Sequence, residues 1–144
     1  MIPAIITRVS EAVPALQGRV YGAAALAALM KADSVPTLTP CVHVLPIGIA
    51  GAPRAATAAS AYRQMIERQF ALILSLRTHD PNGAQVLDEA GGLIDQLAAA
   101  ICGWTPANTS GVFALQRVVL ASFARGVAIY ELDFSLPDQL RISP

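Results

Sequence analysis

The chain has 144 residues, of which 54% are hydrophobic and only 14% are charged, against roughly 25% charged in an average soluble domain. Its ten basic and ten acidic residues balance, so it lacks the basic excess that is typical of nucleic-acid-binding proteins. The long uncharged stretch from Ser34 to Pro53 contains four prolines and does not predict a membrane-spanning helix. The start of the chain carries no recognisable secretion signal, so we expect one soluble, non-secreted domain.

The first part of the sequence predicts two helices and two strands. Apolar residues at helical spacing predict a helix over residues 2–13, which Pro14 ends. A short extended segment at 19–21 and a second helix at 23–31 come next, followed by a strand over 41–49. Pro46 indicates that this strand lies at a sheet edge or contains a bulge.

The middle of the chain predicts a loop and then the longest strand. Residues 50–60 are small and include Gly51 and Pro53, which favours a long loop. The strand over 62–77 is apolar on both faces from Phe70 onward, as a central strand should be. Its first half is polar, so residues 50–68 are expected to project from the core as a loop or as one arm of a hairpin.

The longest predicted helix follows a turn at 79–83 and stops at Gly103, because Gly103 suits a left-handed cap and Pro106 prevents continuation. One stripe of this helix is apolar and should face a core: Val86, Ala90, Leu93, Ile94, Leu97 and Ile101.

Two antiparallel strands are predicted at the end of the chain, over 112–123 and 126–136. Pro137 should end the last strand and leave residues 137–144 as a tail. Together these elements predict a single α+β domain over residues 1–144, with a mostly antiparallel sheet of four or five strands and helices packed on one side.

Several segments, in this order, resemble the tail terminator proteins of long-tailed bacteriophages. They are Val13-Pro14-Ala15-Leu16, Arg19-Val20-Tyr21-Gly22-Ala23-Ala24, Pro40–Pro46, Gln64–Arg77, Asn82-Gly83-Ala84 and Gly103-Trp104-Thr105-Pro106. The resemblance implies a structural virion protein that forms a ring, usually of six subunits. Such a ring caps the completed tail tube, stops its polymerisation and offers a surface for joining the head.

The resemblance also implies where the protein acts and with what. Its partners would be further copies of itself, the major tail tube protein and a head–tail connector or neck protein. The ring would sit at the tail–neck junction of the virion after assembly in the host cytoplasm. Any DNA would pass through its lumen without sequence-specific contact, and neither catalysis, a cofactor nor a membrane would be involved.

The residues favoured for contacts lie mainly in the predicted projection. Arginine and tyrosine are enriched in protein interfaces, so we expect this group to contact the tube or a neighbouring subunit: Arg54, Tyr62, Arg63, Gln64 and Arg68. Charges of an ordinary hairpin in water would explain the same pattern. Glu131 and Asp133 share one face of the last strand, where a subunit contact or a solvated face would explain them.

Two further interpretations remain open. Cys41 and His43 share a strand face, and a thiol beside an imidazole is one start of a metal site or a nucleophilic pair. A small α+β enzyme or ligand-binding domain would use that pair, or else the carboxylates of Glu131 and Asp133. Another ring component of the head–tail connector would also fit. Since only His79 and Cys102 remain as soft ligands, we expect no metal site.

Overall fold

The computed structural model describes residues 1–58, 61–78, 84–109 and 111–142, with the side chains of residues 53–58, 61 and 84–86 outside that description. Helix α1 (Ile2–Ala12) and a 3-10 turn (Pro14–Leu16) lead to the short strand β1 (Val20–Tyr21) and to helix α2 (Ala23–Lys31). The remaining elements are β2 (Cys41–Ala58), β3 (Ala61–Arg77), α3 (Ala84–Ile101), β4 (Ala114–Ala124) and β5 (Val127–Ile142).

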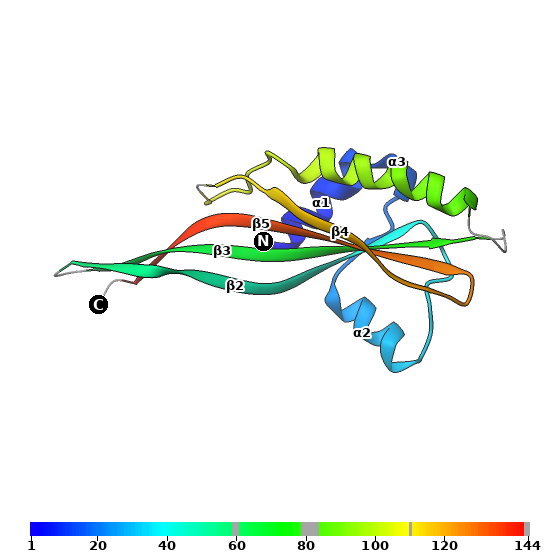
Figure 1. Ribbon diagram of the computed structural model, residues 1–144, viewed down its shortest axis with the longest axis horizontal. Coiled ribbons are helices and arrows are strands. Elements are labelled where there is room, and N and C mark those ends of the chain that lie inside the picture. Colours follow the sequence, from blue (N-terminus) through cyan, green and yellow to red (C-terminus); the bar gives the residue numbers. More distant parts are fainter. Residues whose placement is uncertain (59–60, 79–83, 110, 143–144) are drawn as a thin grey trace.

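The five strands form one sheet in the order β1-β2-β3-β5-β4. Strand β1 runs parallel to β2, and the three other pairings are antiparallel. Figure 1 shows α1 and α3 over one face of the sheet and α2 on the other side. The predicted α+β class with a mostly antiparallel sheet is therefore confirmed. Two of the three helices share one face, and α2 departs from that arrangement.

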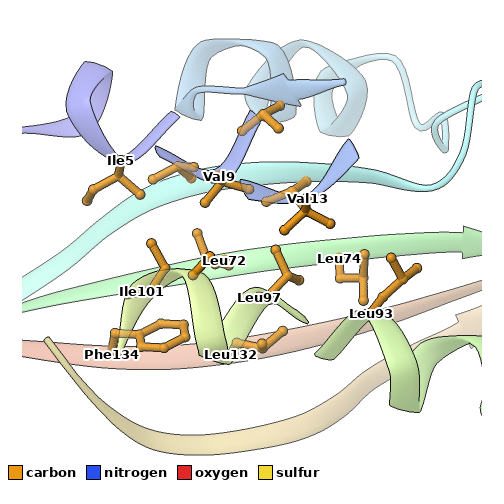
Figure 2. Close-up of a cluster of buried hydrophobic side chains, with 14 of the residues drawn as sticks. Ile5, Val9, Val13, Leu72, Leu74, Leu93, Leu97, Ile101, Leu132 and Phe134 are labelled. Atoms are coloured by element: carbon orange, nitrogen blue, oxygen red, sulfur yellow. The ribbon is translucent and has the colours of Figure 1, made fainter. Parts of the chain in front are cut away.

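The main core lies between the sheet and the two helices that cover it. Alternate residues of the strands face α1 and α3, and every third or fourth residue of each helix faces the sheet. Figure 2 shows this cluster, whose buried members include Ile5, Val9, Val13, Leu72, Leu74, Leu93, Leu97, Ile101, Leu132 and Phe134. Full burial of one such side chain stabilises the fold by roughly 1.5–3 kcal/mol, so α1 and α3 are fixed to this face.

Helix α3 ends where the sequence predicts. Its last residue is Ile101, and Gly103 adopts the left-handed region with φ of 78°. The backbone N–H of Trp104 donates to the carbonyl of Ile101 over 3.1 Å, which satisfies one free carbonyl of the last turn. Most of the predicted apolar stripe is buried: Ala90, Leu93, Leu97 and Ile101. The side chain of Val86 and the predicted turn at 79–83 lie outside the described residues.

The expectation of a loop over residues 50–60 is wrong, because β2 continues to Ala58 and pairs with β3. The ladder places Ala50 opposite Glu67 and Thr57 opposite Tyr62. Two register shifts, between Pro46 and Gly48 and between Gly51 and Ala55, fall beside the prolines of this segment. Such bulges let a strand accept proline and still continue its ladder.

The expectation of a tail over residues 137–144 is also wrong, since β5 runs on to Ile142. Pro137 lies opposite Glu67 of β3, and pairing continues to Ile142 opposite Tyr62. Strand β4 begins at Ala114, opposite Ser135, so β5 is an edge strand beyond that point. Proline is tolerated on an edge strand because the outer side needs no ladder hydrogen bond.

Candidate functional site

A three-stranded projection extends beyond the two helices that cover the core (Figure 1). It consists of residues 48–58 of β2, 61–69 of β3 and 135–142 of β5, and we call it the arm. Five of the seven residues favoured for contacts from the sequence belong to it. The extension of β5 gives the arm its third strand, which adds side chains that the sequence analysis left in a tail.

Arg68 and Asp138 form an ion pair inside the arm. The Nε atom of Arg68 donates to Oδ2 of Asp138 over 2.9 Å, and the two side chains are 33% and 16% exposed. The hydrogen bond from Arg68 lowers the pKa of the Asp138 carboxyl. The partly buried guanidinium is therefore already engaged and links β3 to β5.

Tyr62 and Gln64 form a second connection, this time toward β2. The Tyr62 hydroxyl donates to Oε1 of Gln64, and Nε2 of Gln64 donates to the carbonyl of Ala52, each over 2.9 Å. A Cβ atom at Gly51 would lie 2.7 Å from Nε2 of Gln64. The absence of a side chain at Gly51 thus leaves room for the Gln64 amide to reach β2.

Arg63 is exposed and faces away from these internal contacts. It lies directly opposite Arg141 of β5, which is exposed as well. Arg141 donates to the side chain of Gln139 on its own strand. Opposed like charges on neighbouring strands repel each other, so this end of the arm presents a cationic pair. The side chain of Arg54 lies outside the described residues, although its backbone belongs to β2.

Glu131 and Asp133 lie away from the arm, in the middle of β5. They alternate with the buried Leu132 and so face away from α1 and α3. Arg117 of β4 donates to Oδ2 of Asp133 over 2.8 Å and contacts Oε2 of Glu131 at 3.5 Å. Burial, and next the neighbouring Asp133, raise the pKa of the Glu131 carboxyl. The two carboxylates thus share one exposed arginine.

Cys41 and His43 are both almost fully buried on the face of β2 that α2 approaches. Burial raises the pKa of the Cys41 thiol and lowers the pKa of the His43 imidazole. The thiol is therefore protonated and the imidazole neutral near pH 7, which is the unreactive form of a cysteine. The rings of His43 and Tyr21 lie 5.4 Å apart, so His43 packs as an aromatic side chain.

In the described part of the chain, no group of three or more His, Cys, Asp or Glu side chains is placed to hold a metal ion. None of its helices is long and apolar enough to cross a bilayer. His79, which the sequence analysis considered as a ligand, lies outside the described residues.

Sequence reasoning missed three charged residues that the fold brings to the predicted ones: Arg117, Asp138 and Arg141. A usable signal was present for the last two. Beyond Pro137 the apolar Leu140 and Ile142 alternate with the polar Gln139 and Arg141. That alternation is typical of a strand, and Pro137 concealed it.

Comparison with known proteins agrees with this architecture. The family described as phage tail terminator protein matches residues 1–143. A chain from a solved structure, the virion of a native gene transfer agent particle, is similar in fold, with a TM-score of 0.50 and 12% sequence identity. The similarity covers 96% of this chain and 98% of that chain. No curated protein matches the sequence. The chain therefore belongs to the phage tail terminator protein family.

Proposed function

We propose that the protein forms a hexameric ring that caps the completed tail tube of a phage or phage-like particle, stops tube polymerisation and provides the surface on which the head is joined. Membership of the family makes the chain a structural component of such a tail. The observation that carries the proposal is the extent of the family match, which covers residues 1–143 and so includes both the core and the arm.

In this proposal the arm carries the contacts with the tube or with a neighbouring subunit. Arg54 and Arg63 make the contacts, since a guanidinium on an exposed strand can bind carboxylates and backbone carbonyls of a partner. Tyr62, Gln64 and Arg68 act through their bonds within the arm, which hold its three strands in one register. Glu131 and Asp133 hold the guanidinium of Arg117 in position, and Arg117 contacts a neighbouring subunit.

The proposed partners are further copies of the chain, the tail tube protein and a head–tail connector or neck protein. The proposed location is the tail–neck junction of the virion, after assembly in the host cytoplasm. A role without catalysis is supported by the structural nature of the family and by the raised pKa of the Cys41 thiol. A connector ring next to the terminator is the competing role, and the choice of partner distinguishes the two.

Electron microscopy of the purified protein, alone and mixed with its tail tube protein, tests the proposal. Closed six-fold rings at the ends of tubes, with tube growth stopped by addition of the protein, are expected. Tubes that elongate at the same rate with and without the protein would contradict capping. Rings that ignore tubes and bind the head connector would favour the competing role.

A further inference from the structure

Helix α2 is an apolar helix that its own chain leaves uncovered. Its sequence, AAALAALMK, has Lys31 as its one charged residue. None of its nine residues, all of which the structure describes, is buried, and Met30 is 73% exposed. A helix of this composition normally buries an apolar stripe against a core. In this monomer α2 therefore keeps an unusual amount of apolar surface in contact with water.

A groove of about 460 Å³ lies between α2 and the edge of the sheet formed by β1 and β2. Its walls are mostly apolar and include Tyr21, Ala28, Leu29 and Leu38, and His43 lies at its floor. Nδ1 of His43 is buried without a hydrogen-bond partner among the described residues. A buried polar atom of this kind normally has a partner. The groove therefore offers an occupant both apolar surface and a nitrogen atom that can form a hydrogen bond.

Strand β4 is a second uncovered apolar surface. All but one of its eleven residues are exposed, including the large apolar side chains of Leu115, Leu120 and Phe123 at 40%, 49% and 46%. Arg117, its one charged residue, is held by Asp133. Natural edge strands are usually protected by lysine, proline or a covering element. Strand β4 has two register shifts but neither lysine nor proline, so it suits pairing or packing with another chain.

The two surfaces lie at the two ends of the strand order, since β1 and β2 begin the order and β4 ends it. Arg125, directly after β4, contacts Asp33, which follows α2, at 3.1 Å. This contact shows that the end of β4 and the end of α2 lie close together within one subunit. Different surfaces on one subunit pair head to tail, and such pairing closes a ring when the rotation allows it. Each surface is almost free of unpaired charge. The two surfaces can therefore be buried against each other without the cost of removing an unpaired charge from water.

We infer that strand β4 of one copy packs into the groove beside α2 of the next copy, and that this contact builds the ring. The inference rests on the proposed function and names the two subunit surfaces involved. The occupant of the groove is thus a second copy of this chain. The apolar side chains of β4 cover Ala28 and Leu29, and a donor of the incoming strand reaches the imidazole of His43.

Two variants and two matched controls test this contact by analytical ultracentrifugation and electron microscopy. Ala28→Asp puts a charge in the groove, and Leu120→Asp puts one on β4. Ala99→Asp changes an exposed alanine of α3, and Leu87→Asp changes a leucine of α3 that is 49% exposed, as Leu120 is. We expect each of the first two variants to weaken ring formation at least 100-fold while both controls form rings like the wild type.

Mixing the two defective variants gives the sharper result. Each still has one intact surface, so an equimolar mixture should form heterodimers through a single contact and no closed rings. If Ala28→Asp or Leu120→Asp alone forms rings at the same protein concentration as the wild type, the inference is overturned, while the proposed function of the ring stands. A symmetric dimer of Ala28→Asp through β4 would also overturn it. A wild type that stays monomeric even with tube protein would instead overturn the proposed function.

Disulfide trapping covers the case in which a charged variant fails to fold. In a background with Cys41→Ala and Cys102→Ser, which removes both native thiols, Ala28→Cys and Leu120→Cys in one chain should give a ladder of cross-linked species on oxidation, ending at the ring. Each single cysteine should give no ladder. Folded double-cysteine protein that forms rings but gives no ladder would overturn the inference.

Discussion

The guanidinium of Arg68 lies 2.9 Å from the carboxylate of Asp138 and thereby joins β3 to the last part of β5. The two residues are 70 positions apart in the sequence, and their contact exists because β5 continues past Pro137. This continuation of β5, which pairs with β3 as far as Ile142, turns a two-stranded hairpin into a three-stranded arm. Since a two-stranded hairpin is marginally stable in water, this third strand gives the arm its rigidity.

Asp138→Asn and Arg68→Ala should each destabilise the protein by about 1 kcal/mol, because the pair is charge-assisted and only partly exposed. Urea unfolding of both single variants and of the double variant measures the coupling between the two side chains. The double variant should lose little more than either single one. Arg141→Ala, at an exposed arginine of the same arm, is the control and should change stability by less than about 0.5 kcal/mol. Strictly additive losses would show that the ion pair contributes nothing.

The same pair predicts a dependence on pH. Because Arg68 lowers the pKa of Asp138 in the folded state, the unfolded state binds more protons between the folded and unfolded pKa values, and stability rises with pH there. The contribution is complete above the ordinary pKa of about 3.9 and is lost as pH falls through the lowered value. The stability difference between wild type and Asp138→Asn should therefore be constant from pH 7 to 5 and shrink toward pH 2. A constant difference down to pH 2 would contradict the lowered pKa.

Gly51 provides a test of the connection between β2 and β3. A methyl group at this position would lie 2.7 Å from Nε2 of Gln64, so Gly51→Ala should displace the Gln64 amide and break its hydrogen bond to Ala52. We expect a loss of about 1 kcal/mol in unfolding free energy. In a Gln64→Ala background the same substitution should cost little, since the side chain that it displaces is gone. An equal loss in both backgrounds would place the cause in the backbone instead.

Much of the fold could be predicted because its core follows strict spacing. Leu72, Leu74 and Leu132 alternate along strands, while Leu93 and Leu97 recur at helical spacing, and all five are buried. These periods depend on local geometry alone, so one sequence is sufficient to find them. The left-handed Gly103 is another local signal and was located correctly.

The errors arose where local signals were weak or misleading. Residues 50–58 are mainly alanine and glycine, which carry little strand preference, and their pairing partner on β3 decides their structure. At Pro137 the local rule against proline in strands gave the wrong answer, because β4 begins only at Ala114, opposite Ser135, and so leaves Pro137 on an edge strand. The partners of the predicted site, Asp138 and Arg117, come from other strands, and no spacing rule gives such contacts.

The opposition of Arg63 and Arg141 predicts that function and stability change in different directions. Two exposed guanidinium groups facing each other across strands cost the fold some energy, so Arg63→Gln should leave stability unchanged or raise it by roughly 0.2–0.5 kcal/mol. If Arg63 contacts carboxylates of the tube, one of the contacts that we propose for the arm, this variant should still form rings but cap tubes more weakly. Capping by the wild type should also weaken with added salt, because exposed charges are screened over roughly 10 Å at 0.1 M.

Tube-length distributions by electron microscopy, measured across a salt series, give the capping result, and urea unfolding gives the stability. Met65→Gln, a change without charge at an exposed residue of β3 two positions from Arg63, is the control and should cap like the wild type. A residue kept only for the fold would lose stability and capping together when it is replaced. A variant at Arg63 that is equally or more stable yet caps poorly therefore assigns this side chain to binding. If capping is unchanged in Arg63→Gln and insensitive to salt, Arg63 and Arg141 do not take part in the contact with the tube.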